Sequence, residues 1–166
     1  MEHLWSPWRF RYISTIDKEI GCVFCRVHGP DPREAVETDR TNLVVYRGEL
    51  NFVILNLFPY TSGHLMIAPY AHVASLAAVN LATTAEMMEL TKQAQSALDA
   101  EYKPEGYNIG MNLGRCAGAG VADHIHLHVV PRWSGDANFV SIIGETRVLP
   151  EELSTTFERL KKHFGS

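Results

Sequence analysis

The chain has 166 residues, with 15 Lys and Arg against 19 Asp and Glu, so its formal net charge is −4. Hydrophobic residues make up 46% and charged residues 20%, a globular composition that excludes a largely disordered chain. No apolar run approaches the roughly 18 residues of a membrane span. The start lacks the profile of a signal peptide, and the acidic balance disfavours binding to nucleic acid polymers and membranes. We therefore expect a cytoplasmic protein with a single domain over residues 1–166.

The first part of the chain predicts an aromatic segment followed by three strands. Residues 1–20 are irregular and contain two tryptophans, so we expect them to pack on the body of the protein or on a second subunit. Residues 29–34 predict a turn. Two runs rich in β-branched residues, 42–46 and 51–55, predict a hairpin, and 64–68 predict a third strand.

The second part predicts two helices and two further strands. Thr83 and Glu86 have the spacing of a capping box, and apolar residues recur with helical period after them, which predicts a helix over 83–102. Two strands and a last helix are expected after it, over residues 107–112, 124–130 and 150–164. The predicted class is therefore α+β, with about five mostly antiparallel strands and two principal helices around a core at residues 21–140.

The chain has three cysteines, an odd number and far too few for a disulfide-bonded scaffold. Cys22 and Cys25 form a CxxC pair, for which three interpretations compete: a redox dithiol, a metal site, or a chance pair of small buried residues. A metal site would need two more ligands, and since there is no second CxxC they must be histidines. Cys116 lies in a loop rich in Gly and Ala, and we expect an incidental thiol there.

The segment from Asp123 to Pro131 alternates histidine with apolar residues. A strand has a side-chain period of two, so its two faces carry His124, His126 and His128 on one side and Ile125, Leu127 and Val129 on the other. We expect the apolar face to be buried and the histidine face to border a cleft. Histidines about 6.7 Å apart along a strand cannot easily share one zinc ion, so we expect one end histidine to join the CxxC pair and the middle one to stay free to react.

A glycine-rich loop over residues 112–121 precedes this segment. Backbone N–H groups in such a loop can converge on phosphate oxygens, although many loops of this kind are only tight turns. Arg115 and Arg132 flank the site and would provide a local positive field. The loop therefore predicts an anionic ligand.

These residues resemble the histidine-triad (HIT) family, whose motif is His-φ-His-φ-His-φ-φ with φ apolar; residues 124–130 match it without a gap. The resemblance extends over about residues 20–140. Residues 5–9 and 131–136 are similar to a bacterial branch that includes diadenosine tetraphosphate phosphorylases, also called ATP adenylyltransferases. The resemblance implies a HIT-like fold and a nucleotidyl hydrolase or transferase acting on an α-phosphate.

The resemblance also implies a role for individual residues. His126 corresponds to the nucleophile, which would carry an adenylyl group, and His128 to the histidine that orders the site near the phosphate. Asn56 corresponds to a ribose contact and Asn112 to a phosphate contact, although either could simply form a turn. Trp133 corresponds to a tryptophan near the nucleotide, or it packs without contacting substrate.

Zinc-containing relatives imply one structural zinc ion in this chain and no organic cofactor. The implied ligands are Cys22, Cys25, His72 and His124, with His64 as the rival of His72. Relatives are usually homodimers, and we expect the same here.

One departure from the family matters. Many members carry Gln and Ser or Thr just before the triad, where this chain reads Ala-Gly-Ala-Gly-Val-Ala-Asp over residues 117–123. The backbone N–H of Ala119 or Gly120 would have to replace those side-chain donors.

The leading hypothesis is cleavage of diadenosine polyphosphates of the Ap4A or Ap3A type, with water or phosphate as acceptor. The alternatives are hydrolysis of nucleoside phosphoramidates and non-catalytic nucleotide binding.

Overall fold

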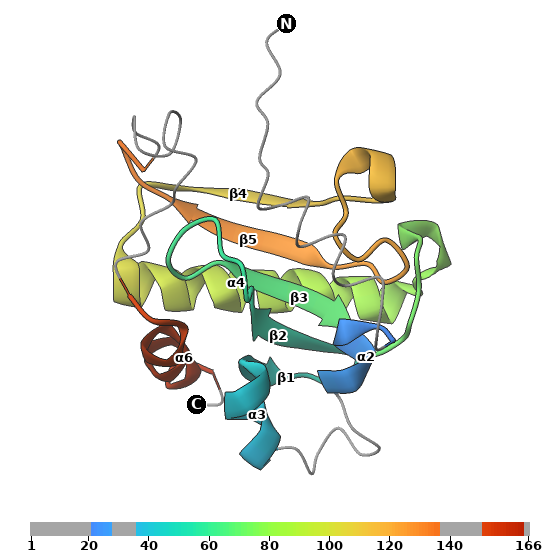
Figure 1. The fold of residues 1–166 in the computed structure, drawn as a ribbon, viewed down its shortest axis with the longest axis horizontal. Coiled ribbons are helices and arrows are strands. Elements are labelled where there is room, and N and C mark those ends of the chain that lie inside the picture. The colour runs from blue at the N-terminus through green and yellow to red at the C-terminus, as the bar shows by residue number, and fades with distance from the viewer. Residues whose placement is uncertain (1–20, 28–35, 137–150, 165–166) are drawn as a thin grey trace, which may run out of the picture.

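The computed structural model describes residues 21–27, 36–136 and 151–164. Its five strands form one sheet in the order β1-β2-β3-β5-β4, and every neighbouring pair is antiparallel (Figure 1). The strands are β1 (Val44–Arg47), β2 (Asn51–Leu55), β3 (Leu65–Pro69), β4 (Gly106–Met111) and β5 (Leu127–Arg132). The helices are α2 (Val23–Val27), α3 (Val36–Asn42), α4 (Leu81–Tyr102) and α6 (Leu153–Lys161), with 3₁₀ turns η1 (Leu76–Ala78) and η2 (Arg115–Ala117). The predicted α+β class and five-stranded sheet are confirmed, whereas the predicted segment 1–20 and turn 29–34 lie outside the described residues.

Two predicted strands begin later than expected. The first begins at Val44, because α3 ends at Asn42 and Leu43 turns the chain with a positive φ of 61°. The last begins at Leu127 instead of residue 124, because the N–H of Ile125 donates to the carbonyl of Val73 at 2.8 Å and not to a neighbouring strand. The segment that holds His124 and His126 is therefore an irregular lead-in to β5.

The start of α4 corrects the predicted capping box. The helix begins at Leu81 and is capped by Asn80, whose side-chain oxygen accepts from the N–H of Thr83 at 2.8 Å. Glu86 does not reach back to the helix terminus. Its carboxylate accepts from the N–H groups of residues 49 and 50, at 2.6 and 2.8 Å, and from the side-chain amide of Asn51 at 2.6 Å. Glu86 therefore fastens the β1–β2 hairpin to α4.

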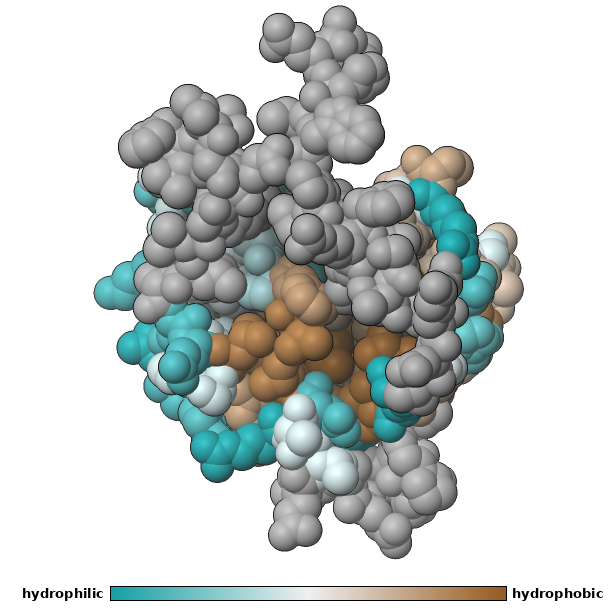
Figure 2. All heavy atoms as spheres, viewed as in Figure 1, coloured by the Kyte–Doolittle hydropathy of each residue, from teal (hydrophilic) through white to brown (hydrophobic). Residues whose placement is uncertain are grey.

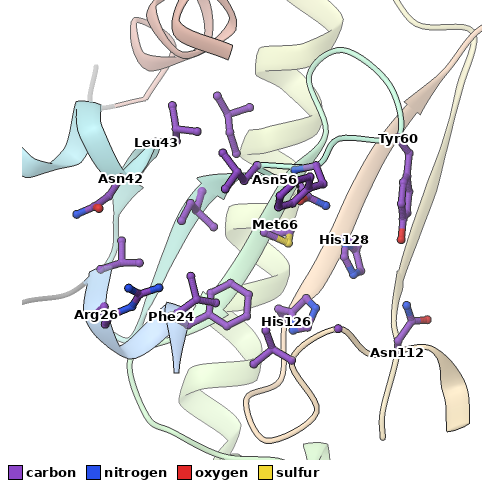
Figure 3. Close-up of a pocket in the computed structure, with 18 of the residues that line it drawn as sticks. Phe24, Arg26, Asn42, Leu43, Asn56, Tyr60, Met66, Asn112, His126 and His128 are labelled. Carbon is purple, nitrogen blue, oxygen red and sulfur yellow. Dashed lines mark hydrogen bonds between the residues drawn. The ribbon is translucent and has the colours of Figure 1, made fainter. Parts of the chain in front are cut away.

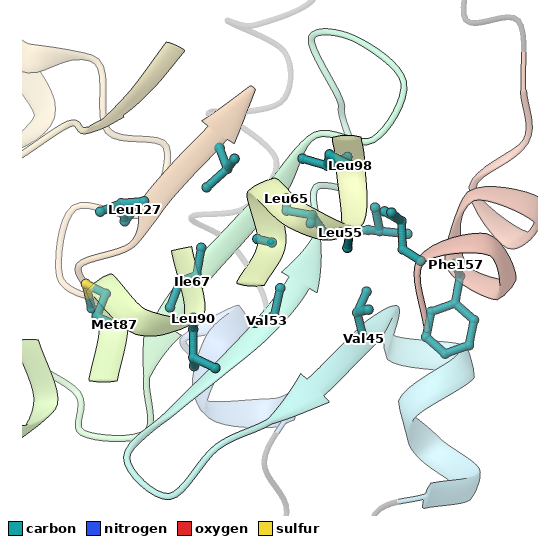
Figure 4. Close-up of a cluster of buried hydrophobic side chains, with 14 of the residues drawn as sticks. Val45, Val53, Leu55, Leu65, Ile67, Met87, Leu90, Leu98, Leu127 and Phe157 are labelled. Atoms are coloured by element: carbon teal, nitrogen blue, oxygen red, sulfur yellow. The ribbon is translucent and has the colours of Figure 1, made fainter. Parts of the chain in front are cut away.

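One face of the sheet packs against α4 and α6 and forms the main core (Figures 1 and 4). The predicted apolar positions of α4 are all buried: Met87, Leu90, Ala94 and Leu98. They meet alternate residues of the strands, among them Val53, Leu65, Ile67 and Val129. The predicted C-terminal helix adds Phe157 and Leu160 to this core, and it is shorter than expected, since it spans Leu153–Lys161.

The opposite face carries a smaller apolar cluster beneath α2. Phe24 and Val27 of this helix pack on residues that alternate with those of the main core: Val44, Phe52, Ile54, Met66 and Ala68. In Figure 2 apolar residues gather on this face around a hollow. Neither α2 nor α3 is predicted from the sequence. Among the described residues, no helix is both long and apolar enough to cross a membrane.

Candidate functional site

The alternation around the three histidines separates core from site. Their apolar neighbours join the main core, as the strand period predicts: Ile125, Leu127 and Val129. On the other face His126 and His128 line a cavity, and His124 turns toward the cysteines. The side chains keep their alternation although His124 and His126 precede β5. One short segment thus supplies both the candidate reactive residues and a candidate metal ligand.

One ring nitrogen of His126, Nδ1, is hydrogen-bonded to the backbone, and the other, Nε2, is available to react. Its Nδ1 lies 3.0 Å from the carbonyl oxygen of His124. A carbonyl can only accept, so Nδ1–H donates and Nε2 keeps its lone pair. Burial lowers the pKa of His126, and the bond to this carbonyl opposes the shift. The ring of Phe24 packs against the imidazole, with centroids 4.9 Å apart. The arrangement presents a neutral imidazole with a fixed tautomer.

His128 is oriented by a fourth histidine. Nδ1 of His64 accepts from the backbone N–H of Tyr60 at 3.1 Å, which places the proton of neutral His64 on Nε2. That Nε2–H donates to Nδ1 of His128 at 2.9 Å. Neutral His128 therefore carries its proton on Nε2, where it can donate to an oxygen anion. From the sequence, His64 is expected only as a rival zinc ligand, and its pairing with His128 is not predicted.

The two cysteines and two histidines that the resemblance implies as ligands form one cluster. The ligand atoms of Cys22, Cys25, His72 and His124 all lie within 4.8 Å of one another. Cys22 Sγ and Cys25 Sγ lie 3.3 and 3.6 Å from Nδ1 of His124, and Cys25 Sγ lies 3.2 Å from Nδ1 of His72. The structure thus places His72, and not His64, beside the CxxC pair.

The cluster fits a tetrahedral zinc ion. Bonds of about 2.3 Å to sulfur and 2.0–2.1 Å to nitrogen put neighbouring ligand atoms about 3.3–3.8 Å apart, close to the observed separations. The Nε2 of His124 lies 2.8 Å from the carbonyl oxygen of Pro69, so Nε2–H donates and the Nδ1 lone pair faces the sulfurs. Two thiols and two correctly oriented imidazoles are a donor set that Zn²⁺ prefers.

A redox dithiol fits this environment less well. Burial and the neighbouring Cys22 raise the pKa of Cys25 to about 11. Reactive dithiols need the opposite shift, because the thiolate is the nucleophile. Cys116 is exposed in η2 and lies apart from the cluster.

A cavity of about 450 Å³ opens beside His126 and His128, a volume typical of small-molecule sites (Figure 3). Its walls come from α2, the end of α3, β2 and the glycine-rich loop. Apolar side chains form much of the lining, including Phe24, Val27, Leu43, Ile54 and Met66. Polar groups lie among them or at the edge: Arg26, Asn42, Asn56, Tyr60 and Asn112. This mixture suits a ligand with an apolar ring and polar substituents.

Asn56 directly follows β2 and already has local partners. Its Oδ1 accepts from the N–H of Phe58 at 3.0 Å, and its amide nitrogen lies 3.3 Å from Nδ1 of His64. The turn-forming role that the sequence left open is therefore present. Because Asn56 also lines the cavity, contact with a ribose remains a prediction.

The other predicted substrate contacts divide into two groups. Asn112 and Gly120 line the cavity. Ala119 is buried, and its N–H donates within its own loop at 3.3 Å, so Gly120 is the better placed of the two backbone donors. Arg115 in η2 and Trp133 line neither this cavity nor the adjacent one described below.

Known proteins resemble this chain in sequence and in fold. The model of the HIT domain matches residues 37–135. The chain is 37% identical to the AP-4-A phosphorylase of Mycobacterium tuberculosis, over 94% of this chain and 80% of that protein. It is 27% identical to the adenosine 5′-monophosphoramidase of Schizosaccharomyces pombe, over 85% of this chain and 96% of that protein.

Among solved structures, a Zn-bound histidine triad family protein from Mycobacterium smegmatis matches with a TM-score of 0.65 and 27% identity, covering 86% of this chain and 92% of that one. Sequence and fold therefore lead to the same conclusion: the chain belongs to the HIT family.

Proposed function

We propose that this protein cleaves dinucleoside polyphosphates of the Ap4A or Ap3A type at an α-phosphate, through a covalent adenylyl-His126 intermediate. One observation carries the proposal: a neutral imidazole whose Nδ1–H is fixed by the His124 carbonyl at 3.0 Å lines a cavity of ligand size. The relative from Mycobacterium tuberculosis named AP-4-A phosphorylase, 37% identical, supports both the enzyme class and the substrate class.

In the first step the Nε2 lone pair of His126 forms a bond to the α-phosphorus. The bond between that phosphorus and the bridging oxygen breaks on the opposite side, and its electron pair leaves with the polyphosphate. The imidazole then carries the adenylyl group on Nε2 and keeps its proton on Nδ1, where the His124 carbonyl stabilises the positive charge that develops.

In the second step an acceptor oxygen attacks the same phosphorus and the P–N bond breaks, which returns the electron pair to Nε2. With inorganic phosphate as acceptor, Ap4A gives ADP and ATP; with water it gives AMP and ATP. The proton of the acceptor oxygen passes to solvent as that oxygen bonds to phosphorus. We favour phosphate, since the relative of highest identity reported above is named a phosphorylase.

Donors for the phosphate charge come from His128 and the glycine-rich loop. The relay from His64 leaves Nε2–H of His128 as a donor at the cavity wall. Gly120 lines the same wall, and its backbone N–H supplies a second donor in place of the Gln and Ser or Thr that this chain lacks just before the triad. Such donors act on charge that grows in the transition state.

Hydrolysis of nucleoside phosphoramidates is the second candidate, favoured by the monophosphoramidase relative from Schizosaccharomyces pombe at 27% identity. It would use the same His126 chemistry with an amine as leaving group.

We also propose a structural metal site: Cys22, Cys25, His72 and His124 would hold one Zn²⁺, as the Zn-bound structural neighbour supports.

The experiment incubates the protein with Ap4A, Ap3A and an AMP-amidate, each with and without inorganic phosphate. We expect Ap4A to give ADP and ATP only when phosphate is present, and rapid acid quenching to trap AMP on the protein. His126→Asn should abolish the adduct and lower kcat/KM by about 10⁴-fold or more. His163→Asn is the matched control, because His163 bonds Glu101 at 2.7 Å outside both cavities. A protein that binds nucleotide yet forms no adduct would refute the proposal in favour of non-catalytic binding.

A further inference from the structure

A second cavity, of about 360 Å³, lies over β4 and β5 on the face of the sheet that carries His128. It shares Tyr60, Asn112 and His128 with the first cavity. The two cavities therefore meet beside His128. In Figure 3 Tyr60, Asn112 and His128 lie on one side of His126, and Phe24 and Arg26 lie on the other.

In-line displacement fixes the direction in which the leaving group departs. The leaving oxygen must lie opposite Nε2 of His126 across the α-phosphorus. A nucleoside in the first cavity occupies the side of α2 and β2, and the space continues past His128, whose ring centroid is 4.9 Å from that of His126, into the second cavity. The second cavity is therefore the adjoining space open to the remaining polyphosphate.

The lining of the second cavity is close to neutral in charge. Its one arginine, Arg132, is paired with Asp136, since Nε and Nη2 donate to the carboxylate at 2.6 and 2.8 Å. Nη1 of Arg132 donates to the side-chain oxygen of Asn108 at 2.5 Å. The buried Val130 and the ring of Tyr60 add apolar surface. A bare polyphosphate would find little net positive charge here.

Such a lining suits a nucleoside, which offers an apolar ring together with hydrogen-bonding edges. We propose that the second cavity binds the nucleoside of the leaving group, so that the enzyme selects polyphosphates with a nucleoside at both ends over nucleotides with one. This inference rests on the proposed function, because the leaving group reaches the second cavity only if His126 attacks the α-phosphate.

Gly110 offers a way to fill the second cavity without disturbing the backbone. It lines the cavity opposite His128, and a Cβ added there meets nothing within 4 Å. Gly106 is the matched control: it lies on the same strand, its added Cβ also meets nothing within 4 Å, and it lines neither cavity. We therefore compare Gly110→Trp with Gly106→Trp.

The substrates are Ap4A and adenosine 5′-tetraphosphate, which share four phosphates; the second compound lacks the second nucleoside and carries additional negative charge on its terminal phosphate. A preference due to charge alone would persist in Gly110→Trp, whereas one due to the nucleoside would not. In the unaltered protein we expect kcat/KM to be about 10–100-fold higher for Ap4A. Gly110→Trp should reduce this ratio to within about threefold of unity, with the larger loss of kcat/KM for Ap4A, whereas Gly106→Trp should keep the ratio. Asn108→Trp is the second variant should Gly110→Trp fail to fold.

Two outcomes would overturn the inference and leave the proposed function intact: equal kcat/KM for both substrates in the unaltered protein, or a folded Gly110→Trp protein that keeps the preference for Ap4A. Loss of both activities in Gly110→Trp would mean that Trp displaces His128, and Asn108→Trp then gives the decision: a folded Asn108→Trp protein that keeps the preference for Ap4A would overturn the inference. Failure of the unaltered protein to form an adenylyl adduct with either substrate would instead defeat the proposed function, and the inference with it.

Discussion

At the residue scale, the proton on His128 is set by a side chain 64 positions earlier in the chain. His64 is fully buried, and its bond to the backbone N–H of Tyr60 fixes which of its nitrogens can donate. Replacing His64 with Phe keeps a ring of similar size and removes that donor. We expect kcat to fall about 10–100-fold, the cost of one misplaced hydrogen bond of 1–3 kcal/mol, with little change in KM.

His64→Gln separates positioning from packing. A glutamine amide nitrogen can occupy the place of Nε2 and donate to Nδ1 of His128, so this variant should recover most of kcat, although Tyr60 loses its acceptor in both variants. Steady-state kinetics and thermal melts of the two proteins give the comparison. Equal loss of kcat in two folded variants would show that the donor to His128 is not what matters.

The sequence predicts the two faces of the histidine segment well, because they follow from the alternation of neighbouring residues. Period two alone separates the His126 face from the Leu127 face. The contact between His64 and His128 depends on the β3–β5 register, in which Met66 lies opposite His128, and no sequence spacing expresses that register. Asn56 shows the same limit, because its partner His64 is found only once the turn after β2 is folded.

At the element scale, α2 depends on its contacts for its stability. Five residues are far fewer than the roughly 12 an isolated helix needs. Phe24 anchors one side of the helix in the cluster on the outer face, and Cys22 and Cys25 tether the other to His72 and His124. Metal binding should therefore hold the α2 wall of the first cavity in place.

We predict about one zinc ion per chain by metal analysis, lost in the double variant Cys22→Ser/Cys25→Ser. That variant should melt about 5 °C lower or more, and its KM for Ap4A should rise more than its kcat falls, because α2 supplies wall residues and not the nucleophile.

Cys116→Ser is the control for the zinc experiment, since this exposed thiol lies in η2, outside the cluster. It should keep the metal, the melting temperature and KM. A double variant that is zinc-free and melts like the unaltered protein would exclude a structural role for the metal.

Elements with strong periodicity are predictable, and those held by tertiary contacts are not. The apolar spacing of α4 places its buried face correctly, from Met87 to Leu98. Its start is missed because Glu86, which has the spacing of a capping box with Thr83, is bound instead to the β1–β2 hairpin. The short helices α2 and α3 carry too few residues for a period to be visible.

At the scale of the whole molecule, the sheet divides the protein into a supporting face and a working face. Helices α4 and α6 cover the first, so its strands are held by the larger core. The second carries both cavities, the histidines and the cysteine cluster. Substitutions in the larger core should therefore reduce stability, whereas those on the working face should act mainly on binding and catalysis.

The two edges of the sheet differ in a way that bears on assembly. β1 is covered by α3 and α6. Within the described residues no strand pairs with the outer edge of β4, which carries no charge and no proline over Gly106–Met111 and leaves Ile109 44% exposed. Uncharged edges of this length are templates for pairing with another chain. We predict a homodimer in which the β4 strands of two copies meet.

Sedimentation velocity at micromolar concentration measures whether a single introduced charge breaks the predicted dimer. Ile109→Lys places an ammonium group at the edge and should shift the protein from dimer to monomer, because a buried unpaired charge is costly. Leu76→Lys introduces the same charge at a residue 42% exposed in η1, away from β4, and should leave the dimer intact. A monomer in the unaltered protein would contradict the prediction outright. A dimer that survives Ile109→Lys would place the contact on another surface, since each copy would bring one lysine to the paired β4 strands.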